Sequence, residues 1–175
     1  MRRTILLLLM ILVQSVWSQP DVSQLFQFAK ENKTKPIKDF LKTGGQVNVV
    51  NGKNNTLLIL ACYNNAFEVA DLLLKFNART DLQDFSGNTA LMGAASKGSL
   101  NIVKLLLEKG ADPNQLNFNQ TNALFFAVTF KHLDIAKLLI DYKTDLTHKD
   151  KEGKTVLDHA LALEHQEMID LLLGK

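Results

Sequence analysis

Apolar residues recur along the chain in two alternating arrangements. One is a short apolar run, as in "TLLILAC" and "NALFFAV", and the other is a longer stretch with apolar residues at every third or fourth position, as in "IVKLLLEK". The second arrangement predicts a helix that buries one apolar stripe. Polar stretches rich in Gly, Asn and Asp lie between the pairs and predict turns. The pattern therefore predicts an all-α chain of helix pairs joined by loops.

The whole pattern repeats every 33 residues without an insertion or deletion between Leu25 and Leu173. A single helix pair cannot bury its apolar face alone, but stacked neighbours can. We therefore expect five stacked units, at about residues 21–50, 51–83, 84–116, 117–149 and 150–175. Two sets of residues follow the spacing: Leu25, Leu58, Leu91, Leu124 and Leu157, and Ala61, Ala94, Ala127 and Ala160.

Polar residues mark the expected helix ends. Gly44 and Gly110 follow second helices, where a residue in the left-handed conformation ends the helix at little cost, and Asn77 takes this place in the second unit. A side-chain oxygen can cap the N-terminus of each first helix from the second unit onward. The four expected caps are Thr56, Thr89, Asn122 and Thr155.

The third unit reads "DFSGNTALMGAASKGSLNIVKLLLEKGADPNQ", with "GNTALMGAA" in the place of the motif G-x-T-P-L-H-x-A-A. In period and motif, residues 21–175 resemble the ankyrin repeat family. The proline of the motif is absent throughout, and its histidine is replaced by Ile59, Met92, Phe125 and Asp158. We expect these departures to reduce loop–helix rigidity without changing the fold. The resemblance implies an ankyrin solenoid of helix-turn-helix units with β-turn or hairpin loops.

The N-terminal sequence is MRRTILLLLMILVQSVWSQ, in which two arginines precede an unbroken apolar run from Ile5 to Val13. Nine apolar residues are fewer than the roughly 20 that span a bilayer, and they match the apolar region of a secretory signal peptide. Val16 and Ser18 are suited to cleavage before Gln19. We expect a signal peptide at residues 1–18 and a mature domain at residues 19–175. An uncleaved membrane anchor and a chance N-terminus are the alternatives.

Charge and cysteine content narrow the possible classes of protein. Without the two N-terminal arginines, the 20 basic residues become 18 and balance the 18 acidic residues. A net charge of zero does not favour binding to nucleic acid or to a membrane surface. Cys62 is the only cysteine, so an internal disulfide is impossible.

The amino-acid composition indicates the cellular compartment to which the protein is exported. The basic residues are mostly lysine and asparagine is abundant, which is typical of an AT-rich genome. Together with export and the lack of disulfides, this composition favours a Gram-negative periplasm. A eukaryotic secreted protein is the alternative, and the glycosylation triplets at Asn32, Asn54 and Asn119 keep it open.

Residues 93–99 read G-x-x-x-x-G-S, one lysine short of a phosphate-binding loop. The 33-residue register places Gly93 inside a first helix and Gly98 in the turn between two helices. Ser99 stands where the phosphate-binding lysine would be. We therefore interpret Gly98 as a turn residue and Gly93 as a small residue where helices crowd, and we expect no nucleotide site.

The other residues that could carry chemistry have simpler structural interpretations. Cys62 shares its register with Ala95, which indicates a buried small residue rather than a nucleophile. His132 occupies a turn position where the family often has histidine. His159 and His165 are six residues apart, which is a poor helical spacing for shared metal ligands. We expect no catalytic, cofactor-binding or metal-binding residue and no enzyme activity.

The first unit is rich in lysine. We interpret these side chains as the solvated outer face of a capping unit, with an acidic partner as the alternative. They are Lys30, Lys33, Lys35, Lys38 and Lys42.

The family resemblance also implies a binding surface. In an ankyrin stack, the loop tips and the ends of the first helices line a concave face, whereas the second helices form the convex back. We use the name concave face for this surface, and expect its loop tips to include Lys53, Asn55, Lys151 and Glu152. The expected protein-binding residues are Tyr63, Asn64, Phe85, Ser86, Ser96, Lys97, Phe118, Asn119, Thr129 and Phe130.

Aromatic side chains are favoured anchors at protein interfaces. We therefore expect Tyr63, Phe85, Phe118 and Phe130 to anchor an unidentified protein partner on a monomeric, exported binding module. The alternative for Phe85 and Phe118 is that they only pack on adjacent hairpins. Alternative roles are an accessory or protective subunit of a periplasmic enzyme system, or an inhibitor of an exported toxin.

Overall fold

The computed structural model of the protein describes residues 21–175, so the expected signal peptide lies outside the described residues. Within this range the chain forms ten helices and no β-strand, which confirms the predicted all-α repeat solenoid. The helices are α2 (Val22–Lys30), α3 (Thr34–Lys42), α4 (Leu57–Tyr63), α5 (Phe67–Lys75), α6 (Ala90–Lys97), α7 (Leu100–Glu108), α8 (Ala123–Thr129), α9 (Leu133–Asp141), α10 (Val156–Ala162) and α11 (Gln166–Leu172).

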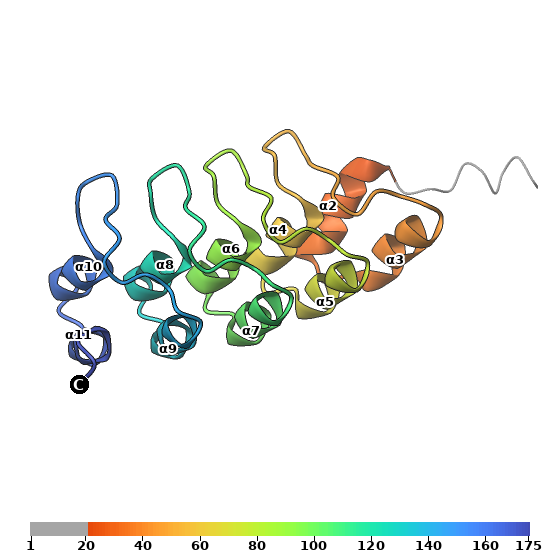
Figure 1. Cartoon of the computed structure of the whole chain (residues 1–175). Helices are drawn as coiled ribbons and strands as arrows, with labels where there is room; N and C mark the ends of the chain where they lie inside the picture. The colour runs from red at the N-terminus through yellow and green to blue at the C-terminus, as the bar shows by residue number, and fades with distance from the viewer. Residues whose placement is uncertain (1–20) are drawn as a thin grey trace, which may run out of the picture.

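The helices stack as consecutive antiparallel pairs (Figure 1). The first helices of the pairs, α2, α4, α6, α8 and α10, form one row, and the second helices form another. A long loop precedes each of the helices α4, α6, α8 and α10 in the chain, and all four loops extend from the stack in the same direction (Figure 1). Neighbouring first helices pack more extensively than neighbouring second helices. The projecting loops lie on the side of this first row, which is where the sequence places the expected concave face (Figure 1).

The core runs continuously through the stack. Leu58, Leu91 and Leu124 are at most 1% exposed, because each lies between two neighbouring helix pairs. Leu157 has the same register position but is only partly buried, since no further pair follows α10 and α11 among the described residues. At the other end of the stack, Leu25 is 0% exposed although no described helix pair precedes it. Coverage by the following pair is therefore enough to bury this position, as nearest-neighbour stacking allows.

The four expected N-terminal caps are all confirmed. The side-chain oxygen of Thr56 accepts a hydrogen bond from the N–H of Ile59 at 3.1 Å, and Thr89, Asn122 and Thr155 cap α6, α8 and α10 in the same way. The cap on α10 is reciprocal, because the Asp158 carboxylate accepts a hydrogen bond from the Thr155 N–H at 2.7 Å. These caps satisfy backbone donors that the first helical turn leaves free.

The turn between the two helices of each pair contains one residue with a positive φ angle. At Gly98 an added Cβ atom would lie 2.6 Å from the His132 ring of the next pair. Gly98 is thus a turn residue that also makes room for a neighbouring histidine, and Gly93 lies within α6, as predicted. The five turn residues, 33 residues apart, are Asn32, Asn65, Gly98, Lys131 and Glu164.

Positive φ angles also follow the second helices. The predicted positions Gly44, Asn77 and Gly110 adopt φ angles of 90°, 59° and 82°. Lys143 has a φ angle of 63° at the equivalent position after α9, although lysine rarely adopts this conformation. The left-handed conformation at this position is therefore kept even where the residue is neither glycine nor asparagine.

Replacement of Leu106 in the central helix α7 tests the burial of the core. Leu106 is 0% exposed, so Leu106→Ala should lower the free energy of unfolding by about 2–5 kcal/mol through lost contacts and a residual cavity. Denaturant titration measures this loss. The matched control is Lys104→Ala on the exposed face of the same helix, which should change stability by about 0.5 kcal/mol or less. A loss below about 1 kcal/mol for Leu106→Ala would contradict the assigned packing.

Candidate functional site

The four projecting loops share one internal design. Each begins with an asparagine or aspartate whose side-chain oxygen accepts hydrogen bonds from the N–H groups two and four residues later. The carboxylate of Asp84, for example, accepts from Ser86 and Asn88, both at 2.9 Å. The four residues, spaced 33 apart, are Asn51, Asp84, Asn117 and Asp150. These four residues were not predicted from the sequence, although their spacing and their short polar side chains are a usable signal.

Neighbouring loops are joined by backbone hydrogen bonds near their tips. The N–H of Phe118 donates to the carbonyl of Ser86 at 3.1 Å, and the N–H of Lys151 donates to the carbonyl of Asn119 at 3.1 Å. A corresponding bond of 3.3 Å runs from Phe85 to Lys53. The loops therefore form a connected row, and such preorganisation lowers the entropy lost on binding.

Three of the four expected aromatic anchors are more than half exposed. Phe85 is 69% exposed, Phe118 is 57% exposed and Phe130 is 53% exposed. Phe118 also packs on the neighbouring loop, because a Cβ atom added to Gly87 would lie 2.7 Å from both its ring and its backbone nitrogen. Phe118 thus combines the two roles considered from the sequence, with one part held by the adjacent loop and the rest open to solvent.

Tyr63 is more enclosed than the other three aromatic residues. Its ring lies over Gly93 of the next helix pair, at 3.1 Å from where a Cβ atom would be, which accounts for the small residue inside α6. Burial raises the pKa of Tyr63 to about 12, and the nearby Asp84 carboxylate adds to the rise, while a hydrogen bond with Asn88 opposes it. Tyr63 therefore connects the end of α4 to the loop that begins at Asp84.

The other predicted binding residues lie on the loops or at the ends of first helices. Ser86 and Asn119 are exposed on loops, whereas Asn64, Lys97 and Thr129 are exposed at the ends of α4, α6 and α8.

Three of the predicted residues at helix ends have local contacts. The Asn64 side-chain amide donates to the Leu60 carbonyl at 2.8 Å. The Ser96 hydroxyl donates to the Gly93 carbonyl at 2.9 Å. Phe130 stacks on His132, with ring centroids 6.4 Å apart, and so belongs to the turn between helices. Phe85 and Phe118 are therefore the aromatic pair that the structure brings onto adjacent loop tips.

The last loop contains a buried acidic side chain that the sequence analysis did not single out. The Asp150 side chain is 8% exposed, and its carboxylate lies 2.7 Å from Nε2 of His159 in α10. Burial alone would raise the pKa of Asp150, but hydrogen bonds from His159 and from the backbone of Lys154 and Glu152 outweigh it and lower the pKa. His159 is thus a partner of this loop.

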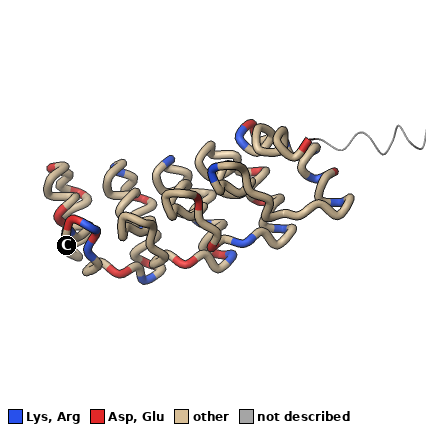
Figure 2. Tube along the Cα trace, turned by 90° about the horizontal axis from the view of Figure 1, so that it is seen from above, with Lys and Arg blue, Asp and Glu red and all other residues tan. Residues whose placement is uncertain are grey.

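Charged side chains are interspersed along the stack (Figure 2). The five lysines of the first unit are exposed, and two of them pair with acidic neighbours: Lys33 lies 2.6 Å from Glu31, and Lys35 lies 3.2 Å from Asp39. Such exposed pairs contribute little to stability. Their exposure agrees with the solvated outer face expected of a capping unit.

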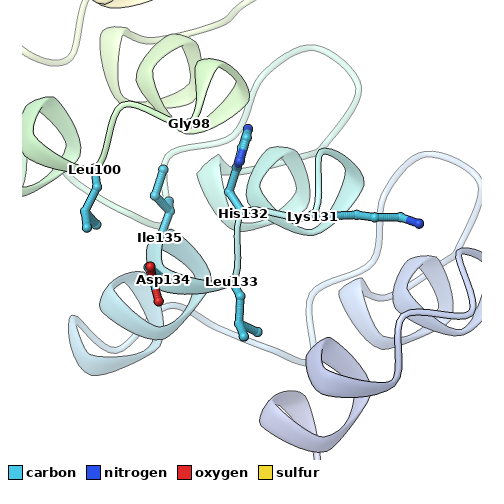
Figure 3. A pocket seen from close by; sticks show the side chains of 7 residues that line it. All are labelled: Gly98, Leu100, Lys131, His132, Leu133, Asp134 and Ile135. Carbon is cyan, nitrogen blue, oxygen red and sulfur yellow. The ribbon is translucent and has the colours of Figure 1, made fainter.

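An open recess of about 330 Å³ lies beside the turn between α8 and α9. Figure 3 shows that its polar side chains do not converge, because Lys131 extends away from His132 and Asp134.

Elsewhere, burial raises the pKa of the Cys62 thiol, which keeps it protonated as the buried small residue predicted from the sequence. Within residues 21–175, no group of three His, Cys, Asp or Glu side chains could hold a metal ion. No described helix is long and apolar enough to cross a membrane.

Substitution of Asp150 tests the electrostatics of the last loop. Because its pKa is lowered on folding from 3.8, its carboxylate stabilises the fold above that pH, and this stabilisation is lost as the pH falls through the lower folded pKa. Asp150→Asn should therefore lower the unfolding temperature at neutral pH. The unfolding temperature of the variant should also decrease less than that of wild type when the pH is lowered into the acid range. Asn51 and Asn117 already hold equivalent loops, so the variant should fold. Equal unfolding temperatures for wild type and Asp150→Asn, from neutral pH down into the acid range, would contradict this assignment.

Comparison with known proteins gives one result about the family. No curated protein sequence matches the chain. The family model described as ankyrin repeats (3 copies) matches residues 25–117 and 110–175, which together include all helices from α3 to α11. Proteins of this family are typically modules that bind other proteins. With its stacked helix pairs and projecting loops, the chain belongs to the ankyrin repeat family.

Proposed function

We propose that this protein is an exported module that binds one partner protein through its concave face. The observation that carries the proposal is the pair of aromatic side chains on adjacent, hydrogen-bonded loops. Phe85 and Phe118 are 69% and 57% exposed, and the loops that present them are fixed to each other through the Phe118 N–H. Rigidly held aromatic side chains are typical anchors of protein interfaces.

The proposed organisation has five ankyrin repeats in one domain spanning residues 19–175. Each repeat corresponds to one of the five helix pairs, and four of the repeats begin with a projecting loop. We infer that the module is a monomer without enzyme activity and that it requires no cofactor. The net charge of zero for residues 19–175 supports a protein partner over a nucleic acid.

Export is proposed from the N-terminal sequence, in which two arginines precede the apolar run from Ile5 to Val13. The composition and the single cysteine favour a bacterial periplasm over an extracellular location. In that compartment, a module of this kind could serve an enzyme system as a protective subunit or inhibit an exported toxin. Affinity capture of the mature chain from its own compartment, with identification of the bound protein, distinguishes these roles.

The anchor residues are tested with the captured partner and single alanine variants. Phe85→Ala and Phe118→Ala should each cost about 1–2 kcal/mol of binding free energy, or about 5- to 30-fold in Kd. Phe130→Ala and Tyr63→Ala complete the set, and Tyr63→Ala should also lower stability because its ring packs on Gly93. Circular dichroism checks that each variant is folded.

The matched control for these variants is Phe67→Ala. Phe67 is 39% exposed at the start of α5, so it tests the loss of an exposed phenylalanine outside the concave face. Its affinity should stay within about twofold of wild type. The proposed surface is wrong if all four concave-face variants fold and also bind within that limit.

Processing of the N-terminus tests export separately. If residues 1–18 are a signal peptide, the protein isolated from its native host should begin at Gln19. Intact-mass measurement and N-terminal sequencing determine the first residue. Mature protein that still carries residues 1–18 would contradict export by a cleaved signal peptide.

A further inference from the structure

The first projecting loop contains an asparagine followed by a glycine, Asn51 and Gly52, and this pair occurs once in the chain. Asparagine is a chemically labile residue, since its side-chain amide can be attacked by the backbone nitrogen of the next residue. A following glycine favours this attack because no side chain obstructs it. At Gly52, an added Cβ atom would find no other atom within 4 Å.

The loop polarises the side-chain carbonyl of Asn51. Its Oδ1 atom accepts hydrogen bonds from the N–H groups of Lys53 at 2.9 Å and Asn55 at 3.1 Å. Attack on the carbonyl carbon would place negative charge on this oxygen, and two backbone donors already point at it. Preorganised donors of this kind stabilise such oxyanions.

Within residues 21–175, the attacking nitrogen has no hydrogen-bond acceptor in this loop alone among the four. In the later loops the corresponding N–H groups, those of Phe85, Phe118 and Lys151, donate to the carbonyl of the preceding loop. None of the hydrogen bonds formed within residues 21–175 uses the N–H of Gly52. The N–H of Gly52 has no such acceptor because no projecting loop precedes this one in the described part of the chain.

We propose that Asn51 is a site of spontaneous deamidation in the folded protein. The Gly52 nitrogen loses its proton to water and forms a bond to Cγ of Asn51. The Cγ–Nδ2 bond then breaks, and the amide group leaves as ammonia after taking a proton from solvent. Water opens the resulting five-membered imide, so that the net reaction consumes one water molecule and releases one ammonia molecule.

The two products of ring opening differ in how they fit the loop. Opening at Cγ gives aspartate, which is the residue found at the equivalent positions Asp84 and Asp150. There the carboxylates accept the same pair of backbone hydrogen bonds, at 2.9 Å each. Opening at the backbone carbonyl gives isoaspartate, whose extra main-chain carbon disrupts this geometry. Deamidation therefore adds a negative charge next to Lys53 on the concave face, and only the aspartate form preserves the loop.

The structure supplies a matched control in Asn117. Its Oδ1 atom accepts the same two backbone hydrogen bonds, from Asn119 and Thr121. Asn117 is only 4% exposed, and its Nδ2 donates to Asn88. The nitrogen that would attack, from Phe118, donates to the loop before it. Asn117 should therefore keep its amide under conditions in which Asn51 loses it.

The test is incubation of the folded mature protein in mildly alkaline buffer, followed by peptide mapping with tandem mass spectrometry. We expect both aspartate and isoaspartate to accumulate at position 51 while Asn117 stays unchanged. The variant Gly52→Ala should slow the reaction at Asn51, and it should fold because space is open at this position. Retention of the amide at Asn51, or conversion of Asn117 at an equal or faster rate, would overturn the proposal.

A second variant tests the fit of the aspartate product. Asn51→Asp should have an unfolding temperature at neutral pH equal to or above that of wild type, because a carboxylate strengthens the two backbone hydrogen bonds. A lower unfolding temperature would show that the loop does not accept the product as Asp84 and Asp150 imply.

Discussion

Burial of apolar side chains between neighbouring helix pairs is the interaction on which the rest of this structure depends. Leu58, Leu91 and Leu124 are almost completely buried, because each is covered from both sides of the stack. The same contact fixes the distance and rotation from one pair to the next, and therefore the spacing of the projecting loops. The concave face is thus a consequence of the core, since its row of loops keeps the 33-residue repeat of the helices beneath it.

The loops use most of their short polar side chains for their own structure. Asp84 and Asp150 carry negative charge, but Oδ1 of each accepts two backbone hydrogen bonds, and Oδ2 of Asp150 lies 2.7 Å from His159. Few polar groups on the inner part of the loops are left to recognise a partner. Ser86 and Asn119 also remain exposed on these loops. The large apolar side chains exposed on adjacent tips are those of Phe85 and Phe118, which explains why the proposed interface depends on them.

The sequence predicts the features that arise within one repeat. The caps at Thr56 and Thr89, the turn at Gly98 and the burial of Cys62 follow from local chemistry combined with the period. Contacts between repeats were not predictable in this way. The position of Tyr63 over Gly93, for example, depends on the offset of one helix pair from the next. Such contacts join residues about 30 apart, and nothing in the types of the two residues indicates that they touch. The Asn or Asp that recurs in each loop, by contrast, could have been predicted from its 33-residue spacing.

Amide hydrogen exchange with and without the captured partner tests the central claim that binding uses the concave face. The account predicts slower exchange on binding in the loops at residues 84–88 and 117–121, because the partner covers their tips and tightens the hydrogen bonds between them. Exchange in the second helices α5, α7 and α9 should not change. Protection confined to those helices, with unchanged exchange in the loops, would place the partner on the opposite side of the stack and contradict the account.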